Sequence, residues 1–106
     1  MTQAEAEWLL AECRRKIDAI DVQLRDLLNH RAKLAEQIRQ SKDVLGLAVH
    51  QPERESEILE KITAGNPGPL SREAVRAIFR SIIQEIRELE AKGAGTHELL
   101  RSSASA

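Results

Sequence analysis

Four charged side chains of this 106-residue sequence occupy positions where helical spacing would place apolar residues. Arg31 interrupts a run of leucines and isoleucines at spacings of three and four, and Lys42 follows it by 11 residues, about three helical turns later. Glu55 and Glu90 lie on the apolar sides of two later segments. Two cations and two carboxylates are therefore predicted to point toward the interior.

Burying a charge costs on the order of several kcal/mol unless an opposite charge or hydrogen bonds compensate it. One interpretation is internal pairing, for instance of Arg31 with Glu55 or Glu90, which would fix the register of the helices. The other is a polar pocket with leucine and isoleucine walls, which would bind a small anionic ligand. The presence of these charges in three separate segments favours the pocket.

A fifth cation, Arg14, constrains how such a pocket is built. It precedes Arg31 by 17 residues, which is roughly 25 Å along one helix and about 100° around it. One small ligand cannot contact both side chains of a single chain. If both arginines serve one site, Arg14 must come from a second subunit.

Other kinds of catalytic site have no matching pattern. The sequence contains no Ser-His-Asp, Cys-His or lysine nucleophile arrangement and no glycine-rich phosphate loop. The histidines, His30, His50 and His97, are too scattered for metal-ligand spacing. We therefore expect no metal site, and fixed cations suit catalysis by positioning and electrostatics.

The composition argues against several classes of partner. The formal net charge of −1 provides no general basic field for nucleic acid. No apolar run approaches the length of a membrane span, and the N-terminus lacks a signal-peptide core. The single cysteine, Cys13, allows no internal disulfide and fits a reducing cytoplasm, where we expect the protein to reside.

The elements that must position these residues are all helical. Gly46 interrupts the first apolar pattern, Pro52 suits the first turn of a second helix, and Ser71 suits the N-cap of a third. The sequence predicts an all-α fold with one helical domain over residues 1–92 and a flexible C-terminal tail over residues 93–106. The predicted helices span about residues 5–43, 52–64 and 71–92.

The first helix is too long for its own chain to cover. Its apolar seam runs from Leu10 to Ile38, and the helix would be roughly 55 Å long. A globule of this chain length is only about 26 Å across. The length therefore predicts a second copy of the chain, and hence a homodimer.

A run of arginines on the third segment is predicted to form a solvated face with glutamate partners nearby. These are Arg72, Arg76, Arg80 and Arg87.

Four segments together carry a resemblance to a known family. They are "RRKIDAID" (14–21), "HRAKLAEQIRQSK" (30–42), "PERESEIL" (52–59) and "IFRSIIQEIRELE" (78–90). With their spacing they resemble the all-helical class of chorismate mutase. The resemblance implies an intertwined homodimer of three-helix chains, in which the partner's long first helix completes each of two pockets. It also implies conversion of chorismate to prephenate, an intramolecular Claisen rearrangement in phenylalanine and tyrosine biosynthesis, without a cofactor.

The resemblance further implies which cations bind the substrate. The partner subunit's Arg14 would hold one carboxylate together with Arg31. Lys42 would contact a carboxylate and the ether oxygen of the breaking bond, and Arg54 would support the anionic end.

The other implied contacts involve the ring and the ether oxygen. Glu55 would accept a hydrogen bond from the ring hydroxyl, and Glu90 stands where members carry Gln or Glu facing the ether oxygen. Gln51 replaces an Asp that some members have near the ring hydroxyl, and Ile86 replaces a Ser near the ring carboxylate. Because Glu90 must be protonated to donate, we expect its pKa to be raised.

Two alternatives remain open at the level of sequence. Isochorismate pyruvate-lyase shares the helical architecture and the cationic pocket. A regulatory domain of a larger aromatic-pathway enzyme is the second, although the complete set of charged residues argues against a purely structural role.

Overall fold

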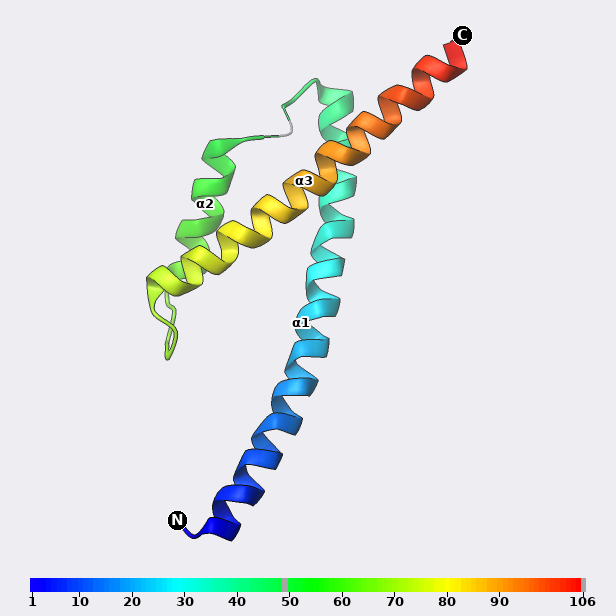
Figure 1. Cartoon of the computed structure of the whole chain (residues 1–106). Coiled ribbons are helices and arrows are strands. Elements are labelled where there is room, and N and C mark those ends of the chain that lie inside the picture. Colours follow the sequence, from blue (N-terminus) through cyan, green and yellow to red (C-terminus); the bar gives the residue numbers. More distant parts are fainter. Residues whose placement is uncertain (49, 106) are drawn as a thin grey trace. The chain divides into compact units, whose positions relative to one another are not determined.

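The computed structural model describes the backbone of residues 1–48 and 50–105 and the side chains of residues 1–48 and 50–93. Three helices follow one another: α1 (Gln3–Leu45), α2 (Pro52–Thr63) and α3 (Arg72–Ser105) (Figure 1). No strand occurs within these ranges, so the predicted all-α fold is confirmed. The chain divides into two compact units, Met1–Lys33 and Leu34–Ala106, which are described separately below.

The first unit consists mainly of the N-terminal part of α1, which begins with a reciprocal cap. The Thr2 hydroxyl accepts a hydrogen bond from the Glu5 backbone N–H at 3.1 Å, and the Glu5 carboxylate accepts one from the Thr2 backbone N–H at 3.4 Å. These bonds satisfy donors that the first helical turn leaves without partners. The helix therefore begins slightly earlier than the predicted start near residue 5.

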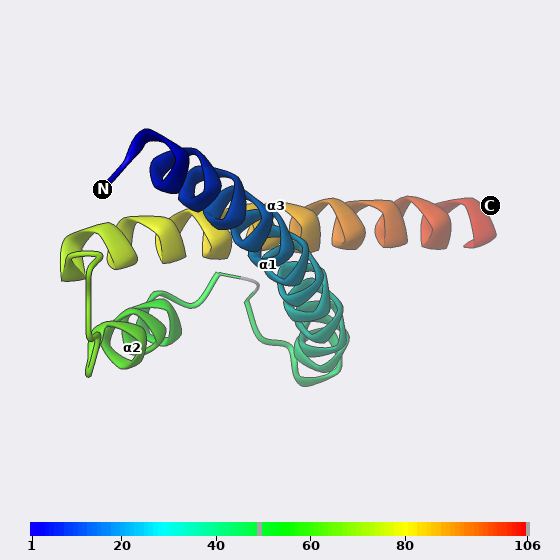
Figure 2. The same cartoon turned by 90° about the horizontal axis from the view of Figure 1, so that it is seen from below.

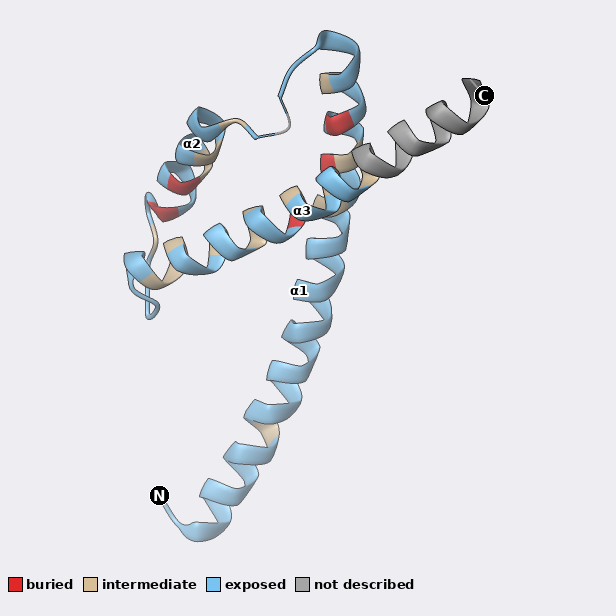
Figure 3. Ribbon diagram, turned by 45° about the horizontal axis from the view of Figure 1, so that its top comes forward, coloured by how far each residue is buried: buried red, intermediate tan, exposed pale blue. Residues whose placement is uncertain are grey.

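The apolar seam of this unit is open to solvent. Five of its large side chains are between 51 and 63% exposed, and Figure 3 shows this part of α1 almost wholly in the colour of exposed residues. They are Leu10, Ile17, Ile20, Leu24 and Leu27. The spacing of the seam is as predicted, and a single chain leaves it uncovered.

In the second unit, α1 ends where glycine permits a left-handed residue. Gly46 has a φ of +71°, and the Leu47 backbone N–H donates to the Lys42 carbonyl at 2.9 Å. This bond is the one that closes a Schellman motif. The predicted interruption at Gly46 is therefore confirmed, with α1 ending at Leu45.

The short helix α2 and the first half of α3 lie side by side (Figures 1 and 2). Pro52 opens α2, as predicted. The hydroxyl of Ser71 accepts a hydrogen bond from the Ala74 backbone N–H at 3.0 Å, so Ser71 caps α3 as predicted. Between the two helices, Leu59 is among the few buried apolar side chains of the described residues.

The end of α1 turns a different face inward from the one that the seam spacing predicts. Leu34 and Ile38 are exposed, whereas Ala35 and Arg39 are buried. Leu34 and Ile38, which continue the apolar seam of α1, therefore remain open to solvent in the single chain, and a buried arginine lies on the neighbouring face.

The third helix is longer than predicted. α3 continues to Ser105, beyond the end expected near Lys92. Glycine costs a helix only about 1 kcal/mol relative to alanine, so Gly93 does not by itself end one. The predicted flexible tail over residues 93–106 starts within this helix, and the side chains after Gly93 lie outside the described residues.

Replacing Gly93 with alanine should raise the free energy of unfolding by up to about 1 kcal/mol, because alanine is the better helix former. A Cβ there would meet Arg39 Nε at 3.5 Å and Glu36 Oε2 at 3.6 Å, which are ordinary contacts. Urea unfolding at fixed chain concentration measures the change.

The matched control is Gly46→Ala. No atom lies within 4 Å of the added Cβ, yet the φ of +71° makes the substitution strained. The free energy of unfolding of this variant should therefore fall by about 1 kcal/mol. A Gly93→Ala variant that loses as much as the control would contradict the placement of Gly93 in a regular helix.

Candidate functional site

Two of the residues predicted to bind substrate meet between α1 and α3. Lys42 Nζ lies 4.0 Å from Glu90 Oε2, and the two side chains are only 14% and 12% exposed. Oε2 of Glu90 is itself buried. A cation and a carboxylate from helices far apart in the sequence are thus brought together largely out of water, where electrostatic interactions are stronger.

A buried guanidinium lies one helical turn before Lys42. Arg39 is 6% exposed; its Nε donates to Glu36 at 3.2 Å, and its Nη1 donates to Asp43 at 3.0 Å. The hydrogen bond from Arg39 lowers the pKa of Glu36. In turn, the hydrogen bond to Glu36 raises the pKa of Arg39, and the charges of Asp43 and Glu90 add to the rise against burial. Arg39 therefore remains a cation whose field reaches Glu90.

Arg39 is absent from the site residues predicted by the sequence. It follows Ala35 by four residues and precedes Lys42 by three, so these residues share one face of α1. This spacing in the sequence could have indicated that Arg39 points in the same direction as Lys42.

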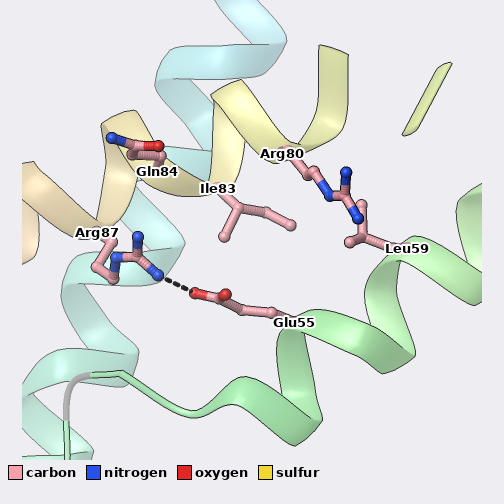
Figure 4. Close-up of a pocket in the computed structure, with 6 residues that line it drawn as sticks. All are labelled: Glu55, Leu59, Arg80, Ile83, Gln84 and Arg87. Atoms are coloured by element: carbon pink, nitrogen blue, oxygen red, sulfur yellow. Dashed lines mark hydrogen bonds and ion pairs between the residues drawn. The ribbon is translucent and has the colours of Figure 1, made fainter. Parts of the chain in front are cut away.

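A second polar contact joins α2 and α3 at Glu55. Arg87 Nη1 donates to Glu55 Oε1 at 2.6 Å, and His50 Nε2 lies 3.4 Å from Glu55 Oε2. Figure 4 shows the Arg87 guanidinium reaching across from α3 to this carboxylate. Both carboxylate oxygens of Glu55, the residue expected to accept the ring hydroxyl, therefore already have polar neighbours.

Glu55 also lines a cavity of about 220 Å³ between α2 and α3. Its walls combine apolar side chains with two guanidinium groups and an amide (Figure 4). The lining residues are Glu55, Leu59, Arg80, Ile83, Gln84 and Arg87. The volume is below the roughly 300–1,000 Å³ of a typical small-molecule pocket, so this cavity alone accommodates part of a ligand.

The remaining predicted site residues of the second unit differ in their surroundings. Gln51 is the N-cap residue of α2, and its carbonyl accepts the Glu55 backbone N–H at 3.2 Å. Ile86 is buried. Arg54 is exposed and donates to Glu57 at 2.9 Å.

Two predicted site residues belong to the first unit. Arg14 is exposed, and Arg31 is partly buried. Both lie on α1, as predicted.

The surroundings of Arg87 differ from the solvated arginine face that the sequence predicts. Arg72, which pairs with Glu60 at the surface, fits the expected solvated face, but Arg87 lines the cavity and contacts Glu55. The signal was present in the sequence, since Arg87 follows Ile83 by four residues and precedes Glu90 by three.

Within residues 1–48 and 50–93, no group of three or more histidine, cysteine, aspartate or glutamate side chains is arranged to hold a metal ion. No helix among these residues has the length and apolar character needed to span a membrane.

Relatives are found by sequence. The bifunctional chorismate mutase/prephenate dehydratase of Aquifex aeolicus is 45% identical over 87 residues, which are 78% of this chain and 24% of that protein. The protein of the same name from Neisseria gonorrhoeae is 40% identical over 82 residues, 77% of this chain and 22% of the relative. This chain therefore spans about a quarter of the length of these two relatives.

Structure and family comparisons agree with the sequence relatives. The chorismate mutase of Thermus thermophilus (form II) matches with a TM-score of 0.75 and 33% identity, covering 77% of this chain and 93% of that one. The family described as "Chorismate mutase type II" matches residues 13–91. The chain therefore belongs to the chorismate mutase type II family.

Proposed function

We propose that this chain is a chorismate mutase, an isomerase that converts chorismate to prephenate. The proposal rests on one observation in a member of this family. Lys42 and Glu90, two predicted site residues, lie 4.0 Å apart, and both side chains are largely removed from solvent. The Thermus thermophilus protein with the same fold is named for this activity, and the match covers most of both chains.

The chemistry requires no bond to the protein. Within the substrate one C–O bond breaks and one C–C bond forms, so the protein has to hold the folded conformer and stabilise the charge that develops. Arg31 would bind a carboxylate of the substrate. Lys42 would donate to the ether oxygen, where the negative charge grows, and Glu90 would donate there as well whenever its carboxyl is protonated. Glu55 would accept from the ring hydroxyl.

A homodimer is part of the proposal. The exposed leucines and isoleucines of α1 form a stripe that a second copy would cover. The exposed Arg14 would then enter the partner's site, where it would join Arg31 in holding carboxylates.

The proposal concerns the mutase reaction alone. The bifunctional relatives carry a second activity in their names, but this chain matches only about a quarter of their length. The two alternatives, an isochorismate pyruvate-lyase and a regulatory domain, would each give a different result in an activity assay. A cytoplasmic location and independence of cofactors remain predictions from the sequence.

The purified chain should consume chorismate and produce prephenate, and Arg31→Ala should lower the rate by about 10²–10³-fold, because a fixed donor to the substrate is lost. The assay follows chorismate disappearance with chromatography of the product, and circular dichroism checks helicity. Arg25→Ala is the matched control, since Arg25 is an exposed arginine of the same unit paired with Asp26. Turnover of isochorismate without turnover of chorismate would favour the lyase, and no turnover of either would favour a regulatory domain.

The rate of the parent should fall as pH rises through the titration of Glu90, because only the protonated carboxyl can donate to the ether oxygen. Glu90→Gln keeps a donor at every pH, so the variant should lose that decline. Steady-state rates across the pH range test this. Identical alkaline declines in the two proteins would show that Glu90 is not the titrating donor.

Mixed variants test the shared site. Arg14→Ala and Arg31→Ala subunits should each be inactive alone and recover up to about a quarter of the parent's activity when mixed equally, since half of the dimers are mixed and one of their two sites is intact. Native mass spectrometry with isotope-labelled subunits confirms exchange. Demonstrated exchange without recovery would count against a partner-supplied Arg14.

A further inference from the structure

The α2–α3 interface contains arginine–glutamate pairs of two kinds. Arg76 donates to Glu60 at 3.3 Å, and that carboxylate is mostly exposed. Arg87 donates to Glu55 at 2.6 Å, beside the cavity, and that carboxylate is only 26% exposed. The two arginine side chains are equally exposed, at 31% and 32%, so the difference lies in the glutamate that each one binds.

The Glu55 carboxylate is held from two sides. Arg87 occupies Oε1, and His50 lies near Oε2. A carboxylate offers about four lone-pair sites, so acceptor capacity remains for a further hydroxyl. A charge-assisted bond from an arginine is short and directional, so it fixes the orientation of a side chain that would otherwise rotate.

We propose that Arg87 is a positioning residue for Glu55. Its guanidinium holds the carboxylate aimed at the cavity, ready to accept the substrate's ring hydroxyl. This assignment rests on the proposed function, because it gives Glu55 the role of hydroxyl acceptor. The Arg87 guanidinium acts through Glu55, and removing either partner removes the same contribution.

The position of Arg87 on α3 supports the proposal. Arg87 follows Ile83, which lines the cavity, by one turn and precedes Glu90 by three residues. Arg87 therefore both lines the cavity and lies on the strip of α3 that leads to the Lys42–Glu90 contact. From this position the Arg87 guanidinium can orient the Glu55 carboxylate, and Arg87 stays on the same face of α3 as the other residues of the proposed site.

The test is a double-mutant cycle in the full chain. Arg87→Met keeps most of the side-chain stem and removes the charge, and it should lower kcat/KM for chorismate by about tenfold, mainly through KM. Glu55→Gln should cause a similar loss. The double variant should be no worse than either single variant, because both remove one contact. Arg87→Lys, which restores a cation, should recover part of the loss.

Arg76→Met is the matched control, since it breaks an arginine–glutamate pair between the same helices, and the two arginine side chains are equally exposed. It should leave kcat/KM within about twofold of the parent, and its effect should add to that of Glu55→Gln. Losses of Arg87→Met and Glu55→Gln that multiply in the double variant would overturn the proposal. An equal fall in activity in the control would overturn it as well.

Unfolding separates this inference from the proposed function. The same four proteins of the cycle are unfolded in urea, and non-additive changes of the midpoint establish the Arg87–Glu55 contact without reference to turnover. If the contact is established but the parent does not turn over chorismate, the proposed function fails. If the parent is active and the midpoint changes are additive, the positioning role of Arg87 fails.

Discussion

The second unit is organised by one constraint: charges that leave water need partners, and the partners of Glu55 and Glu90 come from other helices. On α3, Glu90 meets Lys42 of α1, and Arg87 meets Glu55 of α2. Each contact pairs opposite charges across helices, as partial burial demands. The two contacts lie three residues apart along α3, so the same strip of this helix faces both neighbours.

The apolar core beside these two contacts is small. Among the described side chains, the buried apolar residues are Ala35, Leu59 and Ile86. A core of this size contributes little burial, and large apolar side chains of α1 remain exposed. The proposed dimer would therefore serve two purposes: it would cover the seam of α1 and bring a further arginine to each site. Stability and catalysis would then depend on the same association.

The sequence by itself determined the helices and most of their boundaries. The helix starts at Pro52 and Ser71 and the end before Gly46 follow from local chemistry, since ring geometry, a capping hydroxyl and a left-handed φ each act within a few residues. The inward direction of Lys42 and Glu90 was also readable from spacing, because a helix repeats every 3.6 residues. Both side chains are largely removed from solvent.

The tertiary structure decided which face of each helix is used and which charges meet. Periodicity along α1 favoured the side of Leu34 and Ile38, but the buried side is that of Ala35 and Arg39. Spacing gives the angles between side chains on one helix and carries no information on where a neighbouring helix packs. For the same reason the pairing of Arg87 with a glutamate 32 residues earlier in the chain could be found only in the folded structure.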